Sequence, residues 1–195
     1  MNNMRQAFID LGAGTGGDIA GYYKLNPKNK SHEVFAFEAN PKRIPALRKR
    51  FPNVTIHNAA AGVKDAKTKM YLGNHPNTSS LLKEKVSINT KNFVEVQEID
   101  FCKWLKENFT SNDYITLVVD IEGGEYELLS AMYQQDLWCW IDQLYVEFHG
   151  EKLKGFDINI EHDLTKKLIE FYDKNVYIYR KHQHNQFVKL NPEGC

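Results

Sequence analysis

The sequence predicts an α/β fold: a doubly wound, mainly parallel sheet with helices on both faces and an antiparallel hairpin at its C-terminal end. Short, near-continuous apolar runs, typical of buried parallel strands, alternate along the chain with segments of helical pattern. The first apolar run ends directly at a glycine cluster, and two later runs end in acidic residues. This alternation is typical of strand–helix–strand units that build a parallel sheet.

The first part of the chain predicts three strands and two helices. The expected strands are residues 7–11, 33–38 and 54–57, and the expected helices are residues 18–25 and 41–51. Pro27 follows the first helix and ends it. Pro41 opens the second helix, which carries basic residues toward its end, as the helix dipole favours.

Two segments in the middle of the chain alternate between apolar and polar side chains with a period of two. They are residues 68–72 and 93–99, and a polar loop over residues 73–92 separates them. This pattern predicts a half-exposed antiparallel pair that leaves the main sheet.

The last part of the chain returns to strands and helices in alternation. Asp100 is placed to cap a short helix that ends at Phe109. The remaining expected elements are strands 115–120 and 143–148, a helix from Glu125, a helix over 160–173 and a hairpin of strands 176–180 and 186–190.

Length and composition are typical of one globular domain, which we expect to cover residues 1–195; Cys195 is also consistent with a module of a longer polypeptide. Hydrophobic residues make up 42% of the 195, and charged residues 26%. The 25 basic and 25 acidic residues cancel, which counts against a nucleic-acid partner. The chain has no apolar run long enough for a membrane span and no signal peptide. Its three scattered cysteines indicate a reducing, cytoplasmic location.

The glycine turn after the first strand is the first candidate site. In doubly wound folds ligands bind beyond the carboxyl ends of the strands, and glycines there let the backbone approach a nucleotide. Glu38, at the end of the second strand, can accept both ribose hydroxyls of a nucleoside. Asp10 would repel a pyrophosphate and favours a cofactor with a cationic amino-acid end. The expected cofactor-binding residues are Asp10, Gly12, Ala13, Gly14, Thr15, Gly16, Glu38, Ala39, Ala60 and Asp120.

A second candidate site follows from acidic residues at two later strand ends. Asp120 and Glu147 each end an apolar run, and His149 follows two positions after Glu147. If the two strands are neighbours, these three side chains converge on one cleft. They would then bind a divalent cation, or His149 would act as a general base with its ordinary pKa near ~6.5. For Glu125 and Glu127 we expect only a helix first turn that the helix dipole stabilises.

The polar segment 74–81 is longer than a connection requires, so it is either an acceptor-binding loop or simply a flexible one. We expect Asn77 and Ser79 to bind the acceptor, together with Glu122 after the strand that ends at Asp120.

Five segments resemble, in order, the FkbM-type methyltransferases. They are FIDLGAG (residues 8–14), FEANP (37–41), SSL (79–81), VDIEGGE (119–125) and VEFH (146–149). The resemblance runs from about residue 7 to 150 and is most specific in the acidic block at 120–125. Two positions depart from the family pattern: Val118 stands where a lysine is common, and Ala39-Asn40 separates Glu38 from Pro41.

The resemblance implies a class I, Rossmann-like methyltransferase fold that uses S-adenosyl-L-methionine. By position, Asp10, Gly12 and Gly14 would line the methionine end of the cofactor, Glu38 would bind the ribose, and Ala60 would lie at the adenine edge. Asp120 would form the cleft floor. The implied reaction is O-methylation of a sugar, glycan or related hydroxylated natural product.

A hydroxyl is a poor nucleophile, so the transfer needs a base or a metal ion, and Asp120, Glu147 and His149 are the candidates. Two other interpretations stay open. A nicotinamide-dependent oxidoreductase has a similar glycine turn but gives no reason for Asp10. A non-catalytic cofactor-binding module of a larger protein would bind the cofactor without turnover, or would not bind it at all.

Overall fold

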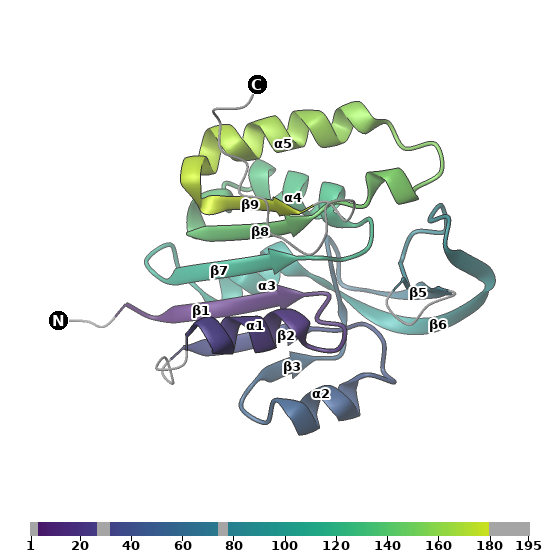
Figure 1. Cartoon of the computed structure of the whole chain (residues 1–195), viewed down its shortest axis with the longest axis horizontal. Helices are drawn as coiled ribbons and strands as arrows, with labels where there is room; N and C mark the ends of the chain where they lie inside the picture. The colour runs from purple at the N-terminus through teal and green to yellow at the C-terminus, as the bar shows by residue number, and fades with distance from the viewer. Residues whose placement is uncertain (1–3, 27–31, 74–77, 180–195) are drawn as a thin grey trace.

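The protein has two sheets, of which the larger is a six-stranded parallel sheet (Figure 1). A computed structural model describes residues 4–26, 32–73 and 78–179. The strands follow the order β3-β2-β1-β7-β8-β9, so the order reverses beside β1 and a ligand crevice is expected there. Their bounds are β1 (Gln6–Leu11), β2 (Glu33–Phe37), β3 (Thr55–His57), β7 (Tyr114–Val119), β8 (Gln143–Glu147) and β9 (Val176–Tyr179). The predicted doubly wound, mainly parallel sheet is confirmed.

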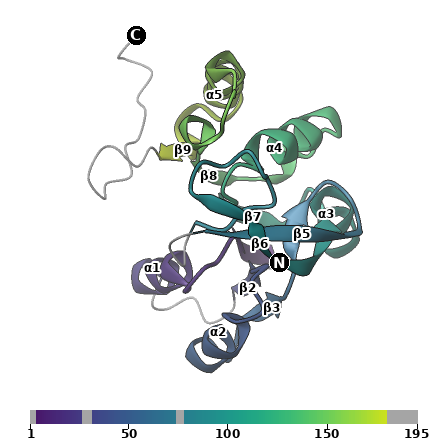
Figure 2. The same cartoon turned by 90° about the vertical axis from the view of Figure 1, so that its right-hand side faces the viewer.

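Helices cover both faces of this sheet (Figure 2). They are α1 (Gly17–Leu25), α2 (Ile44–Arg50), α3 (Phe101–Asn108), α4 (Glu125–Gln134) and α5 (Ile158–Tyr172), with short 3-10 turns at Trp138–Trp140, Gly150–Lys152 and Asp173–Asn175. No helix in the part of the chain described here combines the length and apolar character that a membrane crossing requires.

Alternate residues of the central strands separate two hydrophobic clusters. Ile9 and Leu11 of β1 pack in a cluster with residues of α3, α4 and α5, whereas Phe8 packs in a cluster with residues of α1 and α2. This is the two-residue period of a strand that is buried on both faces. The near-continuous apolar runs in the sequence have this physical cause.

The smaller sheet has the order β4-β6-β5 and carries the predicted antiparallel pair. β5 (Ala66–Gly73) and β6 (Ile88–Asp100) are antiparallel, as expected, and β4 (Ala60–Gly62) pairs with β6 in parallel. The sequence did not indicate β4, because its three small residues are typical of a loop start.

Residues 80–86, which we call the strap, are fixed at both ends. Ser80 bridges to Tyr71 of β5, and Lys85 bridges to Leu153, beyond β8. The Val86 amide also donates to the Lys152 carbonyl at 2.8 Å. The strap is therefore held by backbone hydrogen bonds to two distant parts of the chain.

The first arm of the expected C-terminal hairpin is present as β9. β9 joins the main sheet parallel to β8, with Val146 opposite Ile178. Residues 186–190, the second arm of the expected antiparallel hairpin, lie outside the described residues.

Two free cysteines lie in contrasting surroundings. Cys102 is 1% exposed within α3, and burial raises the pKa of its thiol to about 11. Cys139, in the turn after α4, is exposed. Neither is in a disulfide.

Candidate active site

Beyond the carboxyl ends of β1, β2, β7 and β8 lies a cavity of about 400 Å³. Most residues predicted to bind a cofactor or acceptor line it: Gly12, Ala13, Gly14, Thr15, Glu38, Ala39, Ala60, Ser79, Asp120, Glu122 and Glu147. Three predicted residues are not in its wall, namely Asp10, Gly16 and His149. Asn77 lies outside the described residues. The glycine turn, Glu38 and Asp120 therefore lie around one cavity, whereas Asp10, Gly16 and His149 lie outside its wall.

The glycine turn at the end of β1 is held against two neighbouring strands. The amides of Gly12 and Ala13 both donate to the Phe37 carbonyl at 3.0 Å. Gly12 has φ +93°, and a Cβ there would overlap the carbonyl oxygen of Asp120. Glycine is required at this position because the backbones after β1 and β7 touch.

Glu38 is a buried carboxylate that already organises the cavity wall. Its Oε2 accepts from the Gly14 amide at 2.7 Å, and its Oε1 accepts from the Asn40 amide at 2.6 Å. Arg43 Nη1 lies 3.4 Å from Oε2. A carboxylate has about four acceptor positions, so these three contacts leave about one position for a ribose hydroxyl.

Asp10 lies behind the wall rather than in it. Its side chain is fully buried, and within the described chain neither carboxylate oxygen has a hydrogen-bond partner. Burial, with the charges of Asp18, Asp120 and Glu38, raises the pKa of Asp10 well above its usual value. Unlike Asp10, the carboxylates of Asp18, Asp120 and Glu147 line the cavity. Sequence reasoning missed Asp18, which resembles an ordinary acidic residue in a helix first turn.

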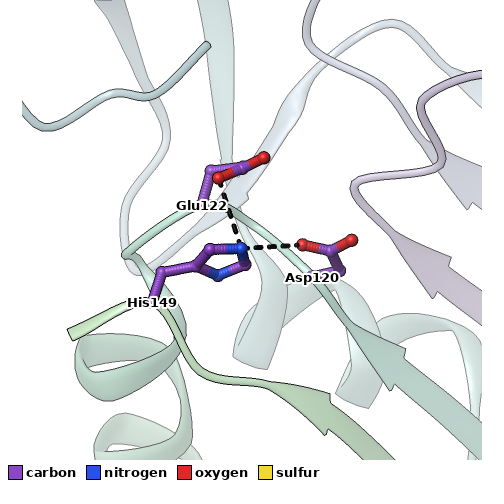
Figure 3. A group of neighbouring side chains, drawn as sticks. All are labelled: Asp120, Glu122 and His149. Atoms are coloured by element: carbon purple, nitrogen blue, oxygen red, sulfur yellow. Dashed lines mark ion pairs between the residues drawn. The ribbon is translucent and has the colours of Figure 1, made fainter. Parts of the chain in front are cut away.

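His149 is enclosed by four carboxylates, which we call the carboxylate box: Asp120, Glu122, Glu125 and Glu147. Its Nδ1 lies 2.9 Å from Glu125 Oε1. Its Nε2 lies 3.3 Å from Glu122 Oε2, 3.3 Å from Glu147 Oε1 and 3.6 Å from Asp120 Oδ1. Figure 3 shows the imidazole between Asp120 and Glu122. The predicted convergence of Asp120, Glu147 and His149 is present, with Glu122 and Glu125 added.

The surroundings of His149 argue against its predicted role as the general base. Burial alone would lower its pKa, but hydrogen bonds to Glu125 and Glu147 and the charges of Glu125 and Asp120 raise it to about 9. In the bare protein the ring is therefore protonated at neutral pH and has no free site for another proton. His149 is also only 1% exposed and does not line the cavity, so an acceptor cannot reach it.

Asp120 is the carboxylate of the box that is most open to the cavity. Its side chain is 33% exposed, against 16% for both Glu122 and Glu147. Burial and the charges of Glu147, Glu125 and Asp18 raise the pKa of Asp120 to about 7, against the lowering effect of His149.

The family model for the methyltransferase FkbM domain matches residues 10–179. The chain belongs to the FkbM methyltransferase family. A solved methyltransferase FkbM from Methylobacillus flagellatus KT is similar at 16% identity and a TM-score of 0.49; the match covers 85% of this chain and 37% of that one. The chain thus spans little more than a third of that protein's length. A comparison with curated proteins gave no match.

In this FkbM domain Glu125 does more than the helix-dipole role we expected for it. It is fully buried, and its carboxylate accepts from the amides of Ile121 and Gly123 as well as contacting His149. Glu127, two positions further along α4, is exposed. Glu125 therefore fixes both the loop after β7 and the orientation of the imidazole.

The strap adds a buried cation that the sequence did not reveal. Lys85 is 1% exposed, and its ammonium is paired with Glu122. Ser80 Oγ donates to the Glu122 carbonyl at 2.8 Å. A lysine in a polar loop has no sequence signature that distinguishes it from a solvated one. The strap thereby forms part of the wall of the FkbM cavity beside the carboxylate box.

Proposed function

We propose that this chain is an S-adenosyl-L-methionine-dependent O-methyltransferase that acts on a hydroxyl of a sugar, glycan or related natural product. Family membership supports methyl transfer. The observation that carries the cofactor assignment is that one cavity has Glu38 in its wall at the end of β2 and three carboxylates near the ends of β1, β7 and β8. A nucleoside with a cationic sulfonium and amine suits such a cavity, since opposite charges attract strongly where water is excluded.

The residues present fit this cofactor. Glu38 would bind the ribose, Ala60 leaves room for the adenine edge, and Asp18 and Asp120 face the cationic end. Asp10 beneath them has no hydrogen-bond partner among the described residues, and a nearby cation would offset the cost of its burial. The cofactor supplies an electrophilic methyl group, so the protein's own work is to align the acceptor and exclude water.

Transfer breaks the bond between the sulfonium sulfur and the methyl carbon, forms a carbon–oxygen bond, and releases the hydroxyl proton. We assign that proton to Asp120 or Glu147, because both carboxylates line the cavity whereas His149 does not. Ser79 also lines the cavity and can orient the acceptor. Glu122 is less suited to acceptor binding than we expected, since Lys85 pairs with it.

Replacement of Glu38 tests the cofactor assignment. We expect Glu38→Ala to weaken S-adenosyl-L-methionine binding by at least about tenfold in calorimetry, because the ribose hydroxyls lose their acceptor. The control is Glu95→Ala, an exposed glutamate of β6 that does not line the cavity. Equal affinities in the wild type and Glu38→Ala would remove the ribose assignment.

Conservative replacements test the proton acceptor. We expect either Asp120→Asn or Glu147→Gln to reduce turnover at saturating cofactor by about 10²- to 10⁴-fold, the usual contribution of a general base. Turnover is measured with labelled cofactor on a panel of glycosides, with and without chelator. If both variants keep full turnover, the proton leaves by another route.

Two rival interpretations predict different binding. A nicotinamide-dependent oxidoreductase would be stabilised by a nicotinamide cofactor and not by S-adenosyl-L-methionine, and thermal shifts with both ligands separate the two. A non-catalytic module would show no methyl transfer to any acceptor of the panel. The family match favours the methyltransferase over the oxidoreductase.

We also propose that residues 1–195 form a single domain and that this domain works in the cytoplasm. The free thiols of Cys102 and Cys139 support this location, because structural disulfides are typical of oxidising compartments.

A further inference from the structure

We propose that Asp120, Glu122 and His149 bind a divalent transition-metal ion in the wall of the cavity. One donor atom from each residue lies within 4.8 Å of the other two. The three side chains point toward one another from the loop after β7 and from the turn after β8 (Figure 3). Asp120 and Glu122 also line the cavity, so a bound ion would face it.

The spacing of the donor atoms around Nε2 fits a shared metal ion. His149 Nε2 lies 3.3 Å from Glu122 Oε2 and 3.6 Å from Asp120 Oδ1. Two ligands that each lie about 2.1 Å from a tetrahedral metal ion are about 3.4 Å apart. The two separations from Nε2 therefore match ligands that share one ion.

The orientation of His149 is that of a metal ligand. Glu125 Oε1 holds Nδ1 at 2.9 Å, which leaves Nε2 directed at Asp120, Glu122 and Glu147. Metal-binding histidines commonly donate one ring N–H to a carboxylate and coordinate through the other nitrogen. The buried Oδ1 of Asp120 accepts no hydrogen bond from the described part of the chain. A cation beside Asp120 Oδ1 would give that oxygen a partner.

The charges of the box also favour a cation. Asp120, Glu122, Glu125 and Glu147 surround the ring, Lys85 pairs with Glu122, and Lys152 Nζ lies 3.9 Å from Glu147 Oε1. Buried carboxylates in this number repel one another unless positive charge lies between them, and a divalent ion on the neutral ring would supply two charges where the imidazolium supplies one. Mixed nitrogen and oxygen donors suit Mn²⁺ or Zn²⁺, whereas Mg²⁺ prefers oxygen ligands alone.

For the reaction, this inference rests on the proposed function. An acceptor hydroxyl that reaches the ion would lose its proton more readily, as metal-bound water does. Asp120 would then be a ligand, and Glu147 would be the carboxylate of the box left to accept the proton.

Metal binding is tested on the full chain, stripped with chelator and without cofactor or acceptor. We expect electron paramagnetic resonance to show one bound Mn²⁺ per chain, displaced by Zn²⁺ and not by equimolar Mg²⁺. Asp120→Asn and Glu122→Gln should each weaken Mn²⁺ binding by at least about tenfold, and Glu125→Gln by about 10- to 100-fold through loss of the ring's orientation. The matched control is Glu95→Gln on β6, an exposed glutamate outside the cavity wall, which should bind like the wild type.

A measurement on the wild type keeps the proposal falsifiable if a variant fails to fold. Zn²⁺ should shift the imidazole resonances of His149 in nuclear magnetic resonance spectra. Unchanged resonances at millimolar Zn²⁺, or equal losses in Glu95→Gln and Asp120→Asn, would overturn the site. The box would then hold only an imidazolium.

Failure of the metal site and failure of the proposed function give different results. Glu38→Ala should keep Mn²⁺ affinity, because Glu38 is not in the box. A chain that binds S-adenosyl-L-methionine but no metal ion refutes the site and leaves the function standing. A chain that binds Mn²⁺ but no S-adenosyl-L-methionine refutes the proposed function and leaves the metal site standing.

Discussion

Asp10 is a carboxylic acid buried without a hydrogen-bond partner in the described structure, and its pKa is raised by that burial and by neighbouring carboxylates. A carboxyl group whose folded-state pKa is raised binds more protons in the folded than in the unfolded state. Its effect on stability is therefore absent at low pH and unfavourable above its unfolded pKa near ~3.9.

We expect Asp10→Asn to remove this cost. Its free energy of unfolding should exceed that of the wild type by more at pH 8 than at pH 5, since the cost of ionising the buried Asp10 is absent from the variant. Urea denaturation at the two pH values measures the difference. Parallel pH profiles for the two proteins would mean that Asp10 is not the titrating group.

Glu125 and Lys85 make buried contacts that could not be predicted from their own sequence positions. Glu125 opens a helix, and a first-turn glutamate is adequately explained by the helix dipole. Its contact with His149 joins residues 24 positions apart and depends on the adjacency of β7 and β8. Neither that contact nor the ion pair of Lys85 with Glu122 has a local pattern, because both arise only when the strands are assembled.

Strands and helices with a strong local pattern were predictable, and the shortest and most context-dependent ones were not. Asp100 caps α3 as expected, with its carboxylate accepting from the Lys103 amide at 3.0 Å. The apolar runs of β1 and β7 became central strands because both of their faces are covered. β4 depends on pairing with β6 rather than on its own residues, so a single sequence carries little sign of it.

The turn after β1 gives a matched pair of glycine substitutions. Gly12→Ala should lower the free energy of unfolding by more than about 3 kcal/mol, because the new Cβ meets the Asp120 carbonyl at a φ that side chains rarely adopt. Gly21→Ala, exposed inside α1 with open space around it, should raise it by about 0.5–1 kcal/mol. Chemical denaturation of both variants is the measurement. Equal effects would mean that the contact between β1 and β7 is not tight.

The cavity draws its wall from both sheets, from the turn after β1 to the strap. A ligand that fills it should therefore stabilise the folded chain as a whole, since the unfolded chain cannot bind it. At 100 times its dissociation constant, S-adenosyl-L-methionine should add about 2.7 kcal/mol. For a chain of this size we expect the melting temperature to rise by about 5–10 °C.

Scanning calorimetry tests this stabilisation, with Glu38→Ala as the variant that should keep the fold and lose most of the shift. A full shift in Glu38→Ala would place the ligand elsewhere in the molecule. Glu38 and Asp120, which the sequence predicts to bind the cofactor, both line this cavity. The place of the strap in its wall was not predictable, because that depends on backbone bridges between residues far apart in the chain.

The exposed Cys139 and the buried Cys102 together can report when the folded protein opens. An alkylating reagent meets Cys139 on the surface at once, whereas Cys102 is shielded in α3 and its raised pKa leaves little reactive thiolate. Modification of Cys102 must wait until α3 leaves the core, so its rate follows the opening of that part of the fold. Mass spectrometry of the two peptides would then time this opening in the native protein without any introduced probe.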